Sequence, residues 1–560
     1  MRDNNTYMRY VGERYFDNRL ATKKEIQDKL SDFDFDSKEH EPNSGGTPLI
    51  SDGHIASLDN TDTHTLVIGS TGSMKTRAFI LPTITSLGLA GENMVVSDPK
   101  GEIFNYTSGF LKNLGYKINV LNFRDFNKTD CWNPLHEAWI LYQKGDLGGA
   151  KLLINDIANI FISEEKNQSR DAFWPMAARD FVSGCLSLLF YTAEKEDEVH
   201  ISSLKPFIIR TYASSSSPLA REFIDFVEEL PDTSTVKLNL SSSVLNADVT
   251  KRGVLGYVSS NINQFIQSRD IDKVTAINTI DMHEYADPTK KIITYIIVPD
   301  EKTTFHFFCS LFVKQLYEVL IKEASSLPGL KLGNRLNFIL DEFANIPAIS
   351  EMSSMISAAR SRNIRFFLVL QSNAQLQRKY GVEEAQNIKT NCQTWCFLNS
   401  KETPLIKEVM DYIGNDDSEQ GKPLLSTGEI SLLEKKFPHV DSIILMNRFR
   451  PFISTLADIS SYSCIFKDGQ PIYPAVEKKM QDFKPVDFDF YKQITAKMKK
   501  DSHFAGSVAK KEDPMLETMV TSVEPDDDDD DDDDFDDDEF ERIFDNLRKQ
   551  NSSTSRKGKK

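Results

Sequence analysis

The chain has 560 residues, of which 40% are hydrophobic and 27% are charged, so it is long enough for about two to four globular domains. No stretch approaches the roughly 20 consecutive apolar residues of a membrane helix, and the N-terminus lacks an apolar signal segment. We therefore expect no transmembrane segment and a cytoplasmic location, with membrane contact only through partners. The six cysteines lack the spacing of a metal site.

The net charge of −18 is concentrated near the C-terminus. Residues 526–541 carry fourteen acidic side chains and no basic one, so leaving them out changes the net charge from −18 to −4. The aspartate run at 526–534 repels itself and buries no apolar area, which predicts a disordered acidic tail. The tail is either a solubilising segment or a docking segment, because Phe540 and Leu547 belong to a possible short amphipathic helix.

The first part of the chain has an α/β pattern. A polar N-terminal extension, residues 1–60, leads into short apolar runs that end in polar turns and alternate with helical stretches. This alternation is typical of βαβ units and a parallel sheet. We assign residues 61–139 to the first part of a nucleotide-binding domain, with expected strands at 63–70, 92–102 and 116–123.

A helical segment interrupts this pattern. Residues 140–285 have helical periodicity and few β-branched runs, which predicts an all-α inserted domain. Strands return in residues 286–480, the second part of the α/β domain, and residues 481–560 form a C-terminal extension that contains the acidic tail. The four returning strands are long apolar runs that suit a parallel sheet covered on both faces, and we expect them at 290–300, 337–342, 364–372 and 393–399.

The segment LVIGSTGSMKT has the order of a phosphate-binding P-loop, with a strand, a glycine turn and then Lys-Thr at the start of a helix. In such loops the backbone N–H groups surround phosphates, the lysine reaches the β- and γ-phosphates, and the threonine hydroxyl binds Mg²⁺. The alternative is an ordinary strand-turn-helix or a degenerate site. The residues expected to contact nucleotide are Gly69, Ser70, Thr71, Gly72, Ser73, Met74, Lys75 and Thr76.

Met74 departs from the strict P-loop pattern, because it stands where the last glycine is expected. Two conformations are open at this position. With helical dihedrals the side chain has little cost, whereas a positive φ costs about 1 to 3 kcal/mol.

An apolar strand delivers Asp341 and Glu342 in the segment RLNFILDEFANIP. A P-loop ATPase needs one carboxylate near Mg²⁺ and often a second that polarises the attacking water. We assign Asp341 to the metal and Glu342 to the water, although an apolar run followed by Asp-Glu also describes many helix caps.

Three further residues are candidates at other strand ends. Gln371 ends the next strand and would either report the nucleotide state or be a solvated terminus. Arg360 is our candidate for a cation supplied by a neighbouring subunit, with an exposed arginine face as the alternative. Asp98, in the segment SDPKGEIF, either helps to hold the site or caps a turn.

Several motifs in this order resemble the VirD4/TraG family of type IV secretion coupling proteins. They are GSTGSMKT, VVSDPKGE, CWNPL, SRDAFWPMAARDF, FILDEFANIP and LVLQSNAQLQRKYG, and the resemblance covers roughly residues 60–465. It implies a RecA-like P-loop domain interrupted by an all-α domain. By position, the family's Walker A lysine falls on Lys75, its Walker B carboxylates on Asp341 and Glu342, its glutamine on Gln371 and its arginine finger on Arg360.

The resemblance also implies a function. It implies an ATPase, with ATP and Mg²⁺ bound, that assembles as a homo-hexamer and delivers a relaxase-bound single DNA strand to a type IV secretion channel. Many family members have N-terminal membrane helices that this sequence does not show, so a small membrane partner would supply the anchor. The alternatives are a related P-loop motor for protein substrates or duplex DNA, and a nucleotide-gated adaptor with slow hydrolysis.

The DNA expectation rests on this resemblance, because the sequence has no zinc finger and no long basic stripe. The segment 251–253 (KRG) either contacts phosphates or presents solvated charges.

Overall fold

The computed structural model describes residues 19–464, apart from gaps at 163–171, 231, 233, 267, 300, 302–304 and 416–420, together with residue 492. The predicted acidic tail lies outside the described residues. Among the helices in these ranges, none is long and apolar enough to cross a membrane.

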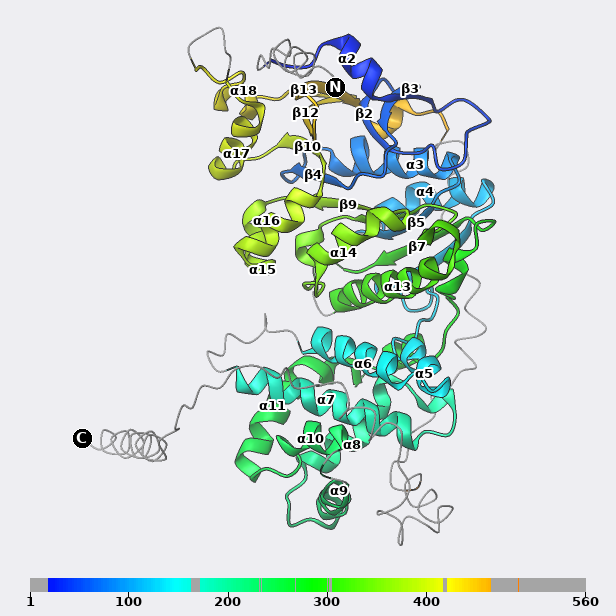
Figure 1. Cartoon of the computed structure of the whole chain (residues 1–560), viewed down its shortest axis with the longest axis vertical. Coiled ribbons are helices and arrows are strands. Elements are labelled where there is room, and N and C mark those ends of the chain that lie inside the picture. Colours follow the sequence, from blue (N-terminus) through cyan, green and yellow to red (C-terminus); the bar gives the residue numbers. More distant parts are fainter. Residues whose placement is uncertain are drawn as a thin grey trace, which may run out of the picture.

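A ten-stranded sheet forms the centre of the upper body in Figure 1, in the order β11-β12-β10-β4-β9-β8-β5-β7-β6, with β13 paired to β12. The run from β10 to β6 is parallel, and the β11-β12-β13 edge is antiparallel. The sheet confirms the predicted α/β class. Its strands are β4 (Thr65–Gly69), β5 (Asn93–Ser97), β6 (Lys117–Asn122), β7 (Ile292–Ile297), β8 (Leu336–Leu340), β9 (Ile364–Leu370), β10 (Thr394–Asn399), β11 (Lys435–Lys436), β12 (His439–Met446) and β13 (Phe452–Ala457).

The central strands are buried on both faces, because successive side chains enter two different cores. Leu368 joins one apolar cluster, whereas its neighbours Phe367 and Val369 join the other. Such strands read as continuous apolar runs, which is why the sequence reveals them. The flanking elements are η1 (Lys75–Ile80, a π-helix), α3 (Leu81–Leu89), α4 (Glu102–Asn113), α13 (His306–Ser326), α14 (Met352–Ala359), α15 (Asn373–Tyr380), α16 (Val382–Asn391), α17 (Thr403–Ile413) and α18 (Thr427–Ser431).

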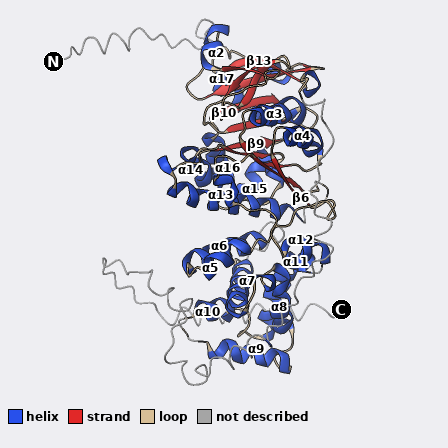
Figure 2. Ribbon diagram, turned by 90° about the vertical axis from the view of Figure 1, so that its right-hand side faces the viewer, coloured by secondary structure: helices blue, strands red, loops and turns tan. Residues whose placement is uncertain are grey.

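The helices between β6 and β7 form a second body, drawn below the sheet in Figures 1 and 2. Helices α6 and α13 are in contact where the two bodies meet, and one apolar cluster runs through both. This arrangement confirms the predicted helical insertion. Its helices are α5 (His136–Gln143), α6 (Leu147–Phe161), α7 (Phe173–Thr192), α8 (Lys205–Tyr212), α9 (Pro218–Glu229), α10 (Thr235–Ser241), α11 (Asp248–Ile266) and α12 (Arg269–Thr275).

The N-terminal segment has structure that the sequence reading did not anticipate. Helix α2 (Lys23–Lys29) is followed by an antiparallel sheet of β1 (Ser31–Asp34), β2 (Thr47–Ser51) and β3 (Ile55–Asp59), in the order β1-β3-β2. Strand β2 packs against β13 of the large sheet. The segment is therefore part of the folded body and not only a polar extension.

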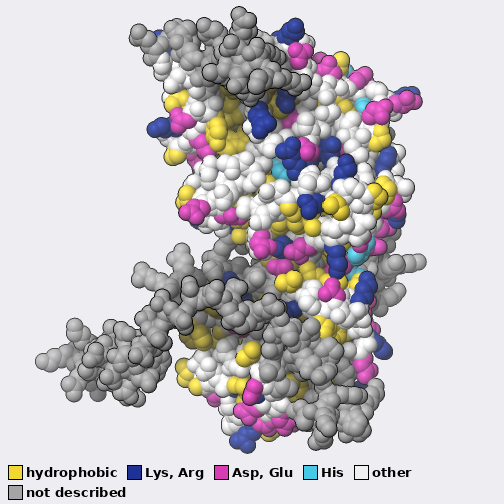
Figure 3. Space-filling model, viewed as in Figure 1, with side chains coloured by type: hydrophobic (Ala, Val, Ile, Leu, Met, Phe, Trp, Pro, Cys, Tyr) yellow, Lys and Arg dark blue, Asp and Glu magenta, His cyan; other side chains and the backbone are white. Residues whose placement is uncertain are grey.

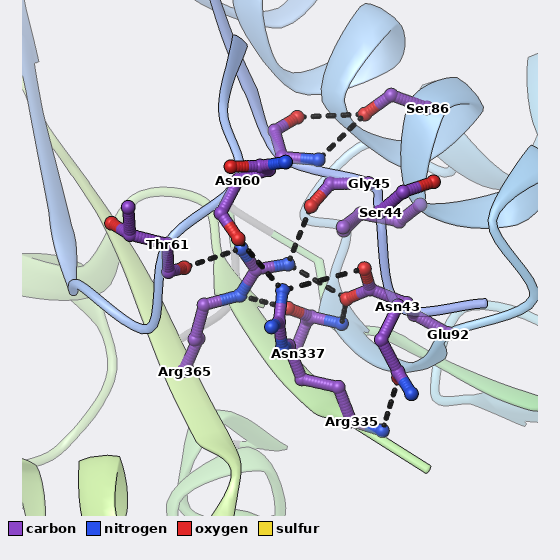
Figure 4. A network of polar contacts seen from close by, with 12 residues as sticks. Asn43, Ser44, Gly45, Asn60, Thr61, Ser86, Glu92, Arg335, Asn337 and Arg365 are labelled. Atoms are coloured by element: carbon purple, nitrogen blue, oxygen red, sulfur yellow. Dashed lines mark hydrogen bonds and ion pairs between the residues drawn. The ribbon is translucent and has the colours of Figure 1, made fainter. Parts of the chain in front are cut away.

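A buried ion pair fixes this N-terminal segment to the large sheet (Figure 4). The Arg365 guanidinium lies 2.7 Å from Glu92 and donates to Asn337 at 2.8 Å, and both charged side chains are buried. Arg365 also donates to the backbone oxygens of Gly45 and Thr61. Burial lowers the pKa of Arg365 to about 10, although the Glu92 charge opposes this shift. Arg365 is thus a structural residue of the core.

We expect Glu92→Leu to destabilise the fold by about 3 to 5 kcal/mol, because it leaves the Arg365 guanidinium buried without its counter-charge. Urea unfolding followed by intrinsic fluorescence measures this loss. The control is Lys322→Ala, which removes an exposed ion pair to Asp146 and should leave the midpoint nearly unchanged. Equal midpoints for Glu92→Leu and wild type would contradict the role of the network.

Candidate functional site

The P-loop connects the end of β4 to η1, and two glycines shape it. A Cβ on Gly69 would lie 2.3 Å from Ser73 Oγ, and Gly72 has a φ of +79°. Met74 also adopts the left-handed conformation, with φ 70° and ψ 18°. Of the two conformations open at this position, the structure therefore has the strained one, which costs about 1 to 3 kcal/mol.

Lys75 lies at the start of η1 with its ammonium turned back onto the loop. Its Nζ donates to the backbone oxygens of Gly69 at 2.6 Å and Ser70 at 3.0 Å. Burial lowers the pKa of Lys75, while the charges of Asp341 and Glu342 oppose that shift. A phosphate would offer this buried cation anionic oxygens in place of neutral carbonyl oxygens.

The Ser73 hydroxyl is a second group in the loop that suits a ligand. Its Oγ is buried and has no hydrogen-bond partner. Buried polar groups are nearly always hydrogen-bonded, so an unsatisfied hydroxyl in a P-loop fits a loop that contacts phosphate oxygens.

Asp341 follows β8 and is almost completely buried. Burial raises its pKa to about 7, the neighbouring charge of Glu342 adds to the rise, and the Lys75 ammonium opposes it. A carboxyl group in this environment gains strongly from a cation nearby. Within the residues that the structure describes, no three His, Cys, Asp or Glu side chains form a ready-made metal site. Asp341 and Thr76 both line the cavity described below, and carboxylate and hydroxyl oxygens are ligands that Mg²⁺ accepts beside phosphate oxygens and water.

Glu342 is held by two amides in a left-handed backbone conformation, with φ 53°. Gln371 donates to Glu342 Oε1 at 2.8 Å, and Asn345 donates to Oε2 at 2.6 Å. Thr71 of the P-loop in turn donates to Gln371 at 3.0 Å. One chain of hydrogen bonds therefore joins the ends of β4, β9 and β8.

These groups line a cavity of about 260 Å³ at the carboxyl ends of the parallel strands. A larger cavity of about 370 Å³ lies near Trp395 and Tyr412, away from the predicted residues. The smaller cavity gathers the charged groups, and we take it as the site. Its lining consists of Thr71, Gly72, Ser73, Met74, Lys75, Thr76, Arg77, Lys100, Glu102, Asp341, Glu342, Gln371 and Lys435.

Asp98 does not line this cavity but supports its wall. Its carboxylate accepts a hydrogen bond from the Phe104 N–H at 2.8 Å, in the first turn of α4. Burial raises the pKa of Asp98 to about 6, whereas hydrogen bonds from backbone N–H groups oppose the rise. Of the two roles predicted for Asp98, the capping contact is present, and the turn that it caps carries Lys100 and Glu102 into the lining.

Two basic residues of the site escaped the sequence reading. Lys435 of β11 donates to the Gly72 oxygen at 2.6 Å, and Arg77 of η1 makes two hydrogen bonds to the buried Asp458 at 2.7 and 2.6 Å. No local motif marks either residue, because the partners are hundreds of positions apart in the chain. The β11-β12-β13 edge and the residue that follows it thus contact both the P-loop and η1.

Arg360 is remote from this chain's own cavity. It precedes β9, whereas Gln371 follows that strand, so the two residues lie at opposite edges of the sheet, roughly 20 Å apart. Its guanidinium pairs with Asp62 at 2.8 Å and is half-exposed. Arg360 therefore does not reach this chain's own cavity.

Comparisons with known proteins identify the family to which this arrangement belongs. Residues 18–444 match the family model described as type IV secretory system conjugative DNA transfer. The VirD4 protein of Rhizobium rhizogenes is 23% identical over 401 residues, which are 67% of this chain and 55% of that protein. The conjugal transfer protein TraG of Escherichia coli is 22% identical over 345 residues, which are 59% of this chain and 51% of that protein. The chain thus spans about half the length of these relatives.

Solved structures of the plasmid coupling protein TrwB share the fold. An unbound form has a TM-score of 0.53 at 14% identity, covering 82% of this chain and 98% of that chain. A complex with ADP and Mg²⁺ has a TM-score of 0.53 at 16% identity, covering 82% of this chain and 97% of that chain. These likenesses establish the RecA-like fold with its helical insertion.

The raised pKa of Asp341 predicts a pH-dependent gain in stability for Asp341→Asn. The folded state keeps the Asp341 proton up to about pH 7, whereas the unfolded chain loses it near pH 4. Wild type therefore loses stability as the pH rises through this window, and the uncharged variant does not. At pH 8 we expect Asp341→Asn to be more stable than wild type by about 1 kcal/mol or more, and at pH 4 the difference should vanish.

Thermal unfolding at pH 4, 6 and 8 measures this dependence. Asp458→Asn is the control, since Arg77 lowers the pKa of the Asp458 carboxyl despite the effect of its burial. That carboxyl therefore titrates at the acid end of this range or below it, and the stability lost in Asp458→Asn should hardly change between pH 6 and 8. A pH-independent difference between Asp341→Asn and wild type would contradict the prediction.

Proposed function

The chain belongs to the type IV secretory system conjugative DNA transfer family, and from this membership and the geometry of the site we propose that it is an ATP-hydrolysing DNA-transfer motor. In this proposal it delivers a relaxase-bound single DNA strand to a type IV secretion channel. The observation that carries the proposal is the cavity in which Lys75, Asp341 and Glu342 meet at one sheet edge.

Each residue then has a role in phosphoryl transfer. Lys75 would leave its backbone oxygens to bind the β- and γ-phosphates of ATP, while Asp341 and Thr76 would hold Mg²⁺. When bound, Mg²⁺ neutralises phosphate charge. Glu342, held by Gln371 and Asn345, polarises the attacking water. Gln371 also accepts a hydrogen bond from Thr71 of the P-loop, so it would move with either the P-loop or Glu342.

The remaining roles require other molecules. We propose a homo-hexamer in which Arg360 of one copy approaches the site of the next, leaving its pair with Asp62. The partners would be a relaxase-bound DNA strand, the secretion channel and a small membrane anchor that holds the protein at the cytoplasmic face.

The DNA part of the proposal rests on family membership. On the face drawn in Figure 3, basic and acidic side chains are interspersed over both bodies. In the KRG segment, Lys251 is buried and donates to Ser215 at 2.8 Å, whereas Arg252 is exposed. A motor that moves any sequence needs few base contacts.

Met74 favours one second candidate, a nucleotide-gated adaptor with slow hydrolysis. Its left-handed backbone places a side chain beside the phosphate path, which would slow the turnover without preventing binding. A motor for protein substrates or duplex DNA would share the same site.

Steady-state ATP hydrolysis with and without single-stranded DNA tests the proposal. We expect DNA to raise the rate several-fold and Lys75→Ala to lower it at least about 100-fold, since it removes a cation that stabilises the transition state. No DNA stimulation together with a rate restored by Met74→Gly would favour the adaptor, and stimulation by duplex DNA or a secreted protein would favour the related motors.

Lys435→Ala is expected to weaken binding of a fluorescent ATP analogue about tenfold, or about 1.4 kcal/mol, because the side chain lines the cavity and supports Gly72. The matched control is Lys436→Ala, whose side chain leaves the other face of the same strand. Fluorescence titration in the presence of Mg²⁺ measures both affinities. Identical affinities for the two variants would exclude Lys435 from the site.

A further inference from the structure

One face of α13 holds the segment that follows the two carboxylates Asp341 and Glu342. His306, Ser310 and Lys314 are spaced four residues apart and therefore lie on the same side of the helix. A ring nitrogen of His306 lies 3.0 Å from the Asn345 oxygen, and the Ser310 hydroxyl donates to the Pro347 oxygen at 2.7 Å. We call this row the α13 ladder.

The first contact of the α13 ladder leads directly to the proposed water-polarising group. The backbone oxygen of Asn345 contacts His306, and the side chain of Asn345 donates to the Glu342 carboxylate at 2.6 Å. Asn345 alone therefore connects Glu342 to α13, and a displacement of Glu342 would move the residue that His306 contacts.

The last contact of the α13 ladder is a buried lysine with three carboxylates. Lys314, only 2% exposed, lies 3.1 Å from Glu351, 3.1 Å from Glu318 and 3.8 Å from Asp156. Glu351 lies directly before α14, with a φ of 60°, in the segment that connects Glu342 to that helix. Asp156 belongs to α6 of the helical insertion. The Lys314 ammonium thus connects the segment between Glu342 and Glu351 with helix α6 of the insertion.

Lys314 can pair with Glu351 or, alternatively, more closely with Glu318 and Asp156. Three carboxylates compete for one cation, and burial raises the pKa of Asp156 and raises that of Glu318 to about 7, while the Lys314 charge opposes both shifts. If Glu351 moved away from Lys314, the ammonium of Lys314 would pair more strongly with Glu318 and Asp156. The next residue, Gln315, donates to the Pro134 oxygen at 2.8 Å, just before α5, so α13 contacts the insertion twice.

We propose that Lys314 is a positioning residue that couples the segment carrying Glu342 to the inserted helical body by holding Glu351 and Asp156 with one ammonium. This inference rests on the proposed function and adds the route by which the nucleotide state reaches the insertion. Such coupling needs a physical element that both sites bias.

Two measurements on the full chain test this coupling, using Lys314→Met and Asp156→Asn. The first is the stimulation of ATP hydrolysis by single-stranded DNA. We expect each variant to keep the wild-type KM for ATP within about twofold and to lose at least about fivefold in stimulation. The double variant should lose no more than either single variant, because both remove the same contact. Asp156→Asn leaves Lys314 paired with two carboxylates, so it tests the coupling even if Lys314→Met fails to fold.

The second measurement is amide hydrogen exchange of α6 with and without a non-hydrolysable ATP analogue and Mg²⁺. In wild type, binding of the analogue should change the exchange rates of the α6 amides. In the two variants, exchange rates should change only for amides around the cavity. The matched control is Lys389→Met, which removes a buried lysine paired with Glu408 far from the cavity and should behave as wild type in both assays.

The outcomes separate the two claims. If the wild-type chain binds no nucleotide, the proposed function fails and this inference fails with it. If wild type responds to nucleotide and DNA but Lys314→Met and Asp156→Asn respond equally well, or if Lys389→Met shows the same loss, only the coupling through Lys314 is overturned.

Discussion

The parallel pairing of β4, β9, β8 and β5 is the constraint on which the site depends. Residues 65–68 of β4 are in register with 367–370 of β9, and 336–340 of β8 pair with both 364–368 and 93–97. The carboxyl ends of all four strands therefore meet at one edge. Because alternate side chains enter two different cores, a shift of one residue would move every side chain into the other core, where it would have to pack against different neighbours. The hydrophobic cores thus fix the positions of the catalytic candidates.

Strain and unfavourable charge are concentrated at this same edge. Met74 and Glu342 have left-handed backbones, Asp341 has a raised pKa and Lys75 a lowered one. A fold optimised for stability alone would avoid these features, and their coincidence in one cavity is typical of sites that bind a charged ligand. The ammonium of Lys75, held by neutral backbone oxygens, and the partnerless hydroxyl of Ser73 both suit a phosphate chain.

The sequence predicts this edge well because short motifs encode it. Glycine turns, the Lys-Thr pair and apolar runs that end in Asp-Glu or Gln are local signals, and they fall at the ends of β4, β8 and β9. The N-terminal sheet could not be predicted, because β1 to β3 are short and depend on packing against β13 and on the buried Arg365–Glu92 pair. Lys435 could not be predicted either, because its contact with Gly72 joins residues far apart in the chain. The φ of Met74 depends on the conformation of the whole loop. The roles assigned to all the site residues remain predictions: Lys75, Thr76, Asp98, Asp341, Glu342, Arg360 and Gln371.

We propose above all that the cavity at this edge binds the phosphates of ATP, and that the resulting movement of the Glu342 segment reaches the inserted helices. A structure of the full chain with a non-hydrolysable ATP analogue and Mg²⁺ tests it most directly. We expect Lys75 Nζ to leave the Gly69 and Ser70 oxygens for the β- and γ-phosphates, with Mg²⁺ beside Thr76 and Asp341. A nucleotide bound elsewhere, with Lys75 still on its backbone oxygens, would contradict the claim.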